Sequence, residues 1–198
     1  MNIHTLTLGD YQTNTYILQN GDRCAVIDPG YEPETVLSFM RRKSLTLDAI
    51  LLTHGHFDHV GGVRALAAET DCKVYLHEAE LSMPPMMTAG PLYYTDTYGD
   101  GDTVTAAGLS VHVLHTPGHT PGSVCLIAED TMFSGDTLFA GSCGRTDFDG
   151  GSAEQMRASL RRLGQLPGDL SVYPGHGESS TLSYERRQNL YLREAMRP

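Results

Sequence analysis

Three histidines and one aspartate crowd into the segment HGHFDH, residues 54–59. The segment follows the apolar run AILL at residues 49–52 and precedes the pair Gly61-Gly62. Imidazole nitrogens and carboxylate oxygens are common ligands of zinc and similar divalent ions. The spacing therefore predicts a metal-binding loop at the end of a buried strand.

Three further residues of ligand type stand where an apolar run ends. His119 follows VLHTPG, Asp136 follows MFSG, and His176 follows VYPG. Because sites of α/β folds gather at the ends of strands, we expect these side chains to meet. The predicted metal ligands are His54, His56, Asp58, His59, His119, Asp136 and His176.

Five imidazoles and two carboxylates exceed the needs of one tetrahedral ion and suit two divalent ions. We expect one ion on His54, His56 and His119, and the other on Asp58, His59 and His176. Asp136 is the natural bridge, so Asp58 and Asp136 are the predicted catalytic carboxylates. A water between two ions is activated for attack, which indicates a hydrolase. Zinc fits best, and iron or manganese also suits these ligands.

The elements that must position these residues alternate between strands and helices. Strands are expected at residues 15–19, 24–27, 47–53, 72–77 and 170–174, with several more between 102 and 139. Helices are expected at residues 32–43, 60–70, 152–167 and 183–196, with Ser152 as an N-cap. The pattern predicts an α/β fold, a four-layer αββα sandwich of two facing sheets with helices outside, forming one domain over residues 1–198.

Residues 79–102 hold three Met, three Pro and three Tyr without a regular period. They predict a loop or short-helix insert. Such a segment overhangs a pocket, or it is an irregular surface connection, and the sequence leaves both interpretations open.

Composition narrows the partners and the compartment. A formal net charge of −10 argues against nucleic acid as a partner and leaves a small-molecule substrate. The chain has no apolar run long enough to span a bilayer and no secretory signal at its start, so we expect no membrane association. Cys24 and Cys125 lie in apolar runs and are expected in the core, as in a reduced, cytoplasmic protein without a disulfide framework. The oligomeric state stays open.

Four residues around the predicted centre have two interpretations each. Asp28, at the end of VIDPG, orients a ligand histidine or caps a turn. His115 supports a ligand or simply packs. Arg145 and Asp147 line the pocket entrance, with Arg145 anchoring an anionic substrate, or they form a salt bridge between loop residues.

These motifs resemble the metallo-β-lactamase fold superfamily, whose mark is HxHxDH followed by single His, Asp and His ligands. Within it, the segments VIDPG, THGHFDHVGG, HTPGHTPGS, GDTLF and PGHG are most similar to glyoxalase II-like hydrolases (hydroxyacylglutathione hydrolases), over residues 11–178. The resemblance implies a binuclear metal-dependent thioesterase that acts on thioesters such as S-lactoylglutathione. The true β-lactamases carry a cysteine at the place of Asp136, so the resemblance argues against that activity.

One departure concerns the thiol part of the substrate. Full-length glyoxalase II enzymes have a further helical domain that holds glutathione, and only residues 177–198 follow His176 here. We therefore expect no separate C-terminal glutathione-binding domain. The segment GSCGRTDFDGG also resembles persulfide dioxygenases, so an oxidoreductase with one iron is the alternative, in which Asp58, His59 and His176 are not ligands. A non-catalytic metal-binding module is a third possibility.

Overall fold

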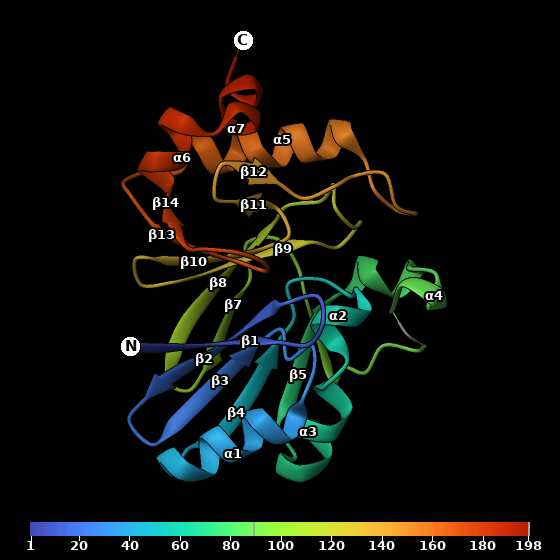
Figure 1. Ribbon diagram of the computed structural model, residues 1–198, viewed down its shortest axis with the longest axis vertical. Helices are drawn as coiled ribbons and strands as arrows, with labels where there is room; N and C mark the ends of the chain where they lie inside the picture. Colours follow the sequence, from blue (N-terminus) through green and yellow to red (C-terminus); the bar gives the residue numbers. More distant parts are fainter. Residues whose placement is uncertain (89, 198) are drawn as a thin grey trace.

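The computed structural model describes residues 1–88 and 90–197 and has the predicted αββα sandwich. Figure 1 shows two facing sheets with helices on the outer side of each. The helices of one outer layer are α1 (Pro33–Lys43) and α3 (Val63–Thr70). Those of the other are α5 (Ala153–Gly164), α6 (Leu182–Gln188) and α7 (Leu190–Ala195). The predicted fold class is confirmed.

The first sheet has six strands in sequence order. They are β1 (Asn2–Leu8), β2 (Thr13–Asn20), β3 (Arg23–Ile27), β4 (Thr46–Leu51), β5 (Lys73–His77) and β6 (Asp96–Tyr98). The pairs from β1 to β3 are antiparallel and those from β3 to β6 are parallel. Strand β1 was not predicted.

The second sheet has the order β14-β13-β10-β9-β8-β7. Its strands are β7 (Thr103–Ala106), β8 (Leu109–His115), β9 (Val124–Ala128), β10 (Thr131–Gly135), β13 (Ser171–Pro174) and β14 (Ser180–Thr181). Only the β10–β13 pair is parallel among the strands described in this sheet. A small hairpin of β11 (Leu138–Phe139) and β12 (Ser142–Cys143) follows β10.

Residues 79–102 are only partly the predicted loop with short helices. The segment contains most of the 3-10 helix η1 (Glu78–Ser82) and the short helix α4 (Pro85–Thr88). Residue 89 lies outside the described residues. Residues 96–98 form β6, an edge strand parallel to β5, so a purely irregular insert was wrong. Pairing with the edge of β5 makes these residues a strand, although their sequence has no regular strand pattern.

Alternating side chains of the strands build three apolar layers. In β3, Cys24 and Val26 pack with the residues of α1 and α3, whereas Ala25 and Ile27 pack between the sheets. In the second sheet, Cys125 packs with the residues of α5 and α7. This period of two is what a strand buried on both faces requires. The predicted core positions of Cys24 and Cys125 are confirmed.

The C-terminal segment forms two helices where one was predicted. Asn189 has extended backbone dihedrals between α6 and α7, and its side-chain oxygen accepts from the Tyr191 and Leu192 amides as the N-cap of α7. Ser152 caps α5 as predicted, accepting from the Gln155 amide at 3.3 Å. Within the described ranges, no helix is both long and apolar enough to cross a membrane.

Candidate metal centre

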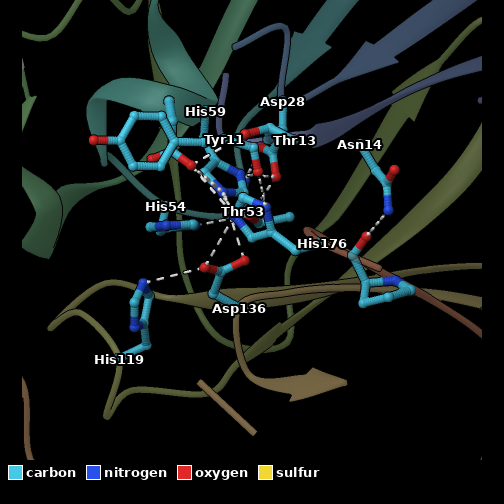
Figure 2. A network of polar contacts seen from close by, with 12 residues as sticks. Tyr11, Thr13, Asn14, Asp28, Thr53, His54, His59, His119, Asp136 and His176 are labelled. Atoms are coloured by element: carbon cyan, nitrogen blue, oxygen red, sulfur yellow. Dashed lines mark hydrogen bonds and ion pairs between the residues drawn. The ribbon is translucent and has the colours of Figure 1, made fainter. Parts of the chain in front are cut away.

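The predicted ligands are brought together from strand ends of both sheets. His54 and His56 follow β4, Asp58 and His59 lie on α2 (Phe57–Val60), His119 follows β8, Asp136 follows β10, and His176 follows β13. Figure 2 shows the labelled members of this set converging on one region. A backbone bridge between Thr13 and His176 joins the two sheets beside it. The centre therefore lies at the edge where the sheets meet.

The first set of ligand atoms belongs to His54, His56 and His119. One ligand atom from each of these buried residues lies within 4.8 Å of the others. Nε2 of all three rings is buried and has no hydrogen-bond partner. Because an unpaired buried nitrogen is costly, three together are explained by a shared cation. The donor set fits a divalent metal ion.

The second set consists of Asp58, His59 and His176, whose ligand atoms also lie within 4.8 Å of one another. Nε2 of His176 lies 3.2 Å from Oδ2 of Asp58, and Nε2 of His59 lies 3.6 Å from the same oxygen. The two Nε2 atoms are 3.3 Å apart. A carboxylate and two imidazoles converge here, which suits a second divalent ion.

Asp136 lies between the two sets. Its Oδ2 is 3.5 Å from Nε2 of His119 and 3.6 Å from Nε2 of His176. Its Oδ1 is 3.5 Å from Nε2 of His59 and has no hydrogen-bond partner. One carboxylate thus faces members of both sets, which is the position that a bridging ligand needs.

Backbone carbonyls orient two of the rings. Nδ1 of His119 lies 2.8 Å from the Arg145 carbonyl, and Nδ1 of His176 lies 3.0 Å from the Tyr11 carbonyl. Since a carbonyl can only accept, each Nδ1 must carry the proton. The lone pair is then on Nε2, which points toward Asp136. Neither carbonyl contact leaves a signal in the sequence.

Asp28 contacts a histidine that is a predicted ligand. Its Oδ2 accepts from Nδ1 of His59 at 3.0 Å and from Oγ1 of Thr53 at 2.5 Å, and its Oδ1 accepts from the Thr53 amide at 2.7 Å. Of the two interpretations, the structure supports the first. The Asp28 carboxylate accepts from His59 and from the residue before His54.

Burial sets the charge state of His54 and His56. It lowers the pKa of His54 well below its usual range and that of His56 to about 4, with the neighbouring histidines adding to the effect. In the second set, burial opposes the charged form of His59, but Asp136, Asp28 and Asp58 outweigh it and raise its pKa to about 9. The neutral rings of His54 and His56 can therefore bind a cation, and carboxylates attract positive charge to the second set.

Glycines let the ligand-bearing turns approach one another. A Cβ on Gly175 would lie 2.2 Å from Oδ1 of Asp136 and 2.7 Å from Cε1 of His59. A Cβ on Gly144 would lie 1.8 Å from the Asp136 carbonyl oxygen. No side chain fits at either position, so both glycines are required by packing.

A cavity of about 560 Å³ opens onto the centre. Side chains of the predicted ligands line it, together with the aromatic side chains of Tyr11, Phe57, Phe139 and Phe148. Met87, from the 79–102 segment, also lines it. That segment therefore reaches the pocket and is not only a surface connection.

Arg145 lines this cavity, whereas Asp147 is not among its lining residues. The guanidinium of Arg145 pairs with Asp147 through two hydrogen bonds of 2.7 Å, and its Cζ lies 3.8 Å from the centre of the Phe148 ring. Both side chains are exposed. The salt bridge and a place at the entrance are thus compatible with each other.

His115 does not reach a ligand ring among the described contacts. Its Nε2 donates to the Pro121 carbonyl at 2.9 Å, two residues beyond His119, and its ring stacks on His77. His77 ends β5, in line with the strand expected at residues 72–77, and is buried. Sequence reasoning also missed Thr13, whose hydroxyl donates to Oδ2 of Asp58 at 3.1 Å.

The chain belongs to the metallo-beta-lactamase superfamily, whose profile matches residues 8–176. Among curated relatives, it is 36% identical to the "Probable metallo-hydrolase YqgX" of Bacillus subtilis, over 94% of this chain and 95% of that one. It is 42% identical to a hydroxyacylglutathione hydrolase of Aeromonas hydrophila, over 81% of this chain. It spans only 59% of that relative's length.

Two solved structures share the fold over nearly the whole chain. A protein titled BLEG-1 B3 metallo-beta-lactamase is 36% identical, with a TM-score of 0.89, over 96% of this chain and 99% of that one. TTHA1623, solved in a di-iron-bound form, is 39% identical with a TM-score of 0.84, over 95% and 99%.

Proposed function

We propose that the protein is a binuclear metal-dependent hydrolase of thioesters such as S-lactoylglutathione. The observation that carries this proposal is the position of Asp136, which faces ligand atoms of both sets at 3.5–3.6 Å. A carboxylate in that position has a clear use only when two ions are held side by side.

Two divalent ions, when bound, would supply a water that is acidic enough to attack at neutral pH and a Lewis acid for the carbonyl oxygen. His54, His56 and His119 would hold one ion, and Asp58, His59 and His176 the other. Asp28 orients the His59 ring by accepting from Nδ1 of that ring. Zinc suits this nitrogen-rich set best, and iron or manganese is compatible with it, as the di-iron form of TTHA1623 illustrates.

The cavity supports a small-molecule substrate. Its aromatic side chains accept apolar parts, and the Arg145 guanidinium at the entrance suits a carboxylate on the substrate. The net charge of −10 disfavours nucleic acid. We propose action on small thioesters in the cytoplasm. Similarity to a hydroxyacylglutathione hydrolase supports the thioester.

A second candidate is β-lactam hydrolysis, favoured by the likeness to the B3 metallo-beta-lactamase structure. A β-lactam is also an acyl compound that an activated water opens. The two candidates share the centre and differ in what the cavity accepts.

The test is hydrolysis of S-lactoylglutathione by purified protein of measured metal content, with chelator-treated protein as the control. We expect chelator-sensitive turnover that returns with zinc. Two other substrates are assayed beside it. One is a chromogenic cephalosporin, and the other is glutathione persulfide, with oxygen uptake as the readout. Turnover of the cephalosporin alone would favour the second candidate. Oxygen uptake by protein with a single iron would replace the hydrolase with an oxidoreductase.

A further inference from the structure

A buried carboxylate outside the ligand set joins the two segments that carry the first three histidines. Glu80 lies on η1, and its side chain is fully buried. Its Oε2 accepts from the Gly55 amide at 2.6 Å, and its Oε1 accepts from the Gly122 amide at 2.6 Å. Gly55 stands between His54 and His56, and Gly122 stands three residues after His119.

The two glycines are matched to this carboxylate. A Cβ on Gly55 would lie 2.8 Å from Oε2 of Glu80. A Cβ on Gly122 would lie 2.8 Å from Cγ of Glu80 and 2.9 Å from its backbone nitrogen and Oε1. Only glycine lets the backbone approach so closely at both points. The backbone at both glycines is therefore close enough to Glu80 that no other residue fits there.

The helix that carries Glu80 is itself fixed at its start. Nδ1 of His77 accepts from the Ala79 amide at 3.2 Å and caps η1. The His77 ring stacks on His115 at a centroid distance of 4.2 Å and an interplanar angle of 8°. His115 in turn donates to the Pro121 carbonyl, beside Gly122. Through this stack, as well as through its own hydrogen bonds, Glu80 is thus held against the loop that contains Gly122.

We propose that Glu80 is a positioning residue that sets the distance between the His54–His56 segment and the His119 loop, and so the affinity of the first set for its metal ion. The inference rests on the proposed function, because it takes these three histidines as ligands of one ion. Two hydrogen bonds to one anion are strong and directional, and partners beyond the ligands tune metal sites in this way. Glu80 touches no ligand side chain in the described contacts.

The fold does not depend on this contact alone. The Val124 amide donates to the Thr53 carbonyl at 2.9 Å and joins the same two segments. Variants at Glu80 are therefore expected to fold with the segments adjacent but less exactly spaced. The effect should fall on metal affinity at one set.

The test uses Glu80→Gln, which keeps the volume but replaces one accepting oxygen with an amide NH2 that cannot accept from a glycine amide. Metal-free protein is titrated with zinc against a chromophoric chelator. We expect one zinc to bind about 10–100-fold more weakly, as for outer partners of metal ligands. The other zinc should weaken by a smaller factor, because Glu80 makes no described contact with Asp58, His59 or His176.

His56→Ala and His176→Ala assign the two zinc affinities to the first and second sets. Glu78→Gln is the matched control, since it makes the same change at an exposed position on the same short helix. Gly122→Ala is the second variant, because its methyl group displaces Glu80 from the His119 loop. It should weaken the same zinc that Glu80→Gln weakens.

Unchanged affinity at the first set in both variants would overturn the proposal, as would equal weakening of both ions. Failure of the proposed function is separate from this result. If the wild type binds a single zinc that His56→Ala abolishes, the two-metal proposal fails. In that case, the proposed role of Glu80 would still require Glu80→Gln to weaken the binding of that single ion by about 10–100-fold.

Discussion

The Asp28 carboxylate lies 3.0 Å from Nδ1 of His59, and both side chains are buried. The same carboxylate accepts from the amide and the hydroxyl of Thr53, the residue before His54. A single anion thus orients a predicted ligand of the second set and holds the segment that leads to the first set.

Asp28→Asn should weaken zinc binding by about 10–100-fold, because the neutral amide is a poorer acceptor for His59 and turns an NH2 group toward Thr53. The backbone should tolerate the change, since Asp28 has a φ of 49° and asparagine accepts this region well. The measurement is a zinc titration against a competing chelator. Asp71→Asn is the control, an exposed residue with a φ of 52°. Equal zinc affinity in both variants would contradict the role.

Arg145→Ala should raise KM for an anionic thioester by about tenfold, the loss expected for one hydrogen bond to a charged group. Thermal stability should hardly change, because the ion pair with Asp147 is exposed. The control is Asp147→Asn, which breaks the ion pair and keeps the guanidinium. Steady-state kinetics separates the two roles: an equal effect of both variants would leave the salt bridge as the only function.

Alkaline pH should destabilise the fold from about pH 9 upward. Burial raises the pKa of Cys24 from 9.0 to about 12 and that of Cys125 to about 11. Below pH 9 both thiols are protonated in the folded and unfolded chains. Above it only the unfolded chain loses these protons, so the free energy of unfolding falls until the folded thiols ionise.

Each thiol contributes a slope of at most about 1.4 kcal/mol per pH unit. Urea denaturation from about pH 8 to about pH 10 measures it. Replacement of Cys24 and Cys125 together by alanine should lower stability at pH 8 and flatten the slope above pH 9. An unchanged slope in that variant would show that the thiols do not cause the effect.

Asn189→Ala should lower the free energy of unfolding by about 2–3 kcal/mol, from the loss of an N-cap and of a donor to half-buried backbone carbonyls. Its Nδ2 donates to the Ser142 carbonyl at 2.9 Å and to Oε2 of Glu185 at 2.8 Å, which fixes the hairpin beside the cavity. Urea denaturation compares it with Asn2→Ala, an exposed change of the same kind. A loss no larger than that of Asn2→Ala would refute the account.

The layers of the fold could be predicted because apolar alternation is written into each buried strand. Strand β1 escaped prediction because it is a mostly exposed or half-buried edge strand, and its register with β2 supplies the order. The break at Asn189 also escaped, since its reason is a side chain that caps α7 and holds a hairpin about fifty residues away.

That these histidine and aspartate side chains lie together could be predicted, because each stands where an apolar run ends. Their supports were harder. Asp28 has such a place, but Glu80 lies in a segment without a period and acts through two backbone amides. The Arg145 and Tyr11 carbonyls that orient His119 and His176 have no side-chain signature at all.

The most direct test of the two-metal centre is the metal content and turnover of Asp136→Ala beside the wild type. Both proteins are loaded with zinc, freed of excess metal, and assayed for zinc per chain and for S-lactoylglutathione hydrolysis. We predict two zinc ions per wild-type chain, and a variant that loses metal and turnover together. An Asp136→Ala protein with full metal and full rate would contradict the bridging role and, with it, the account of this site.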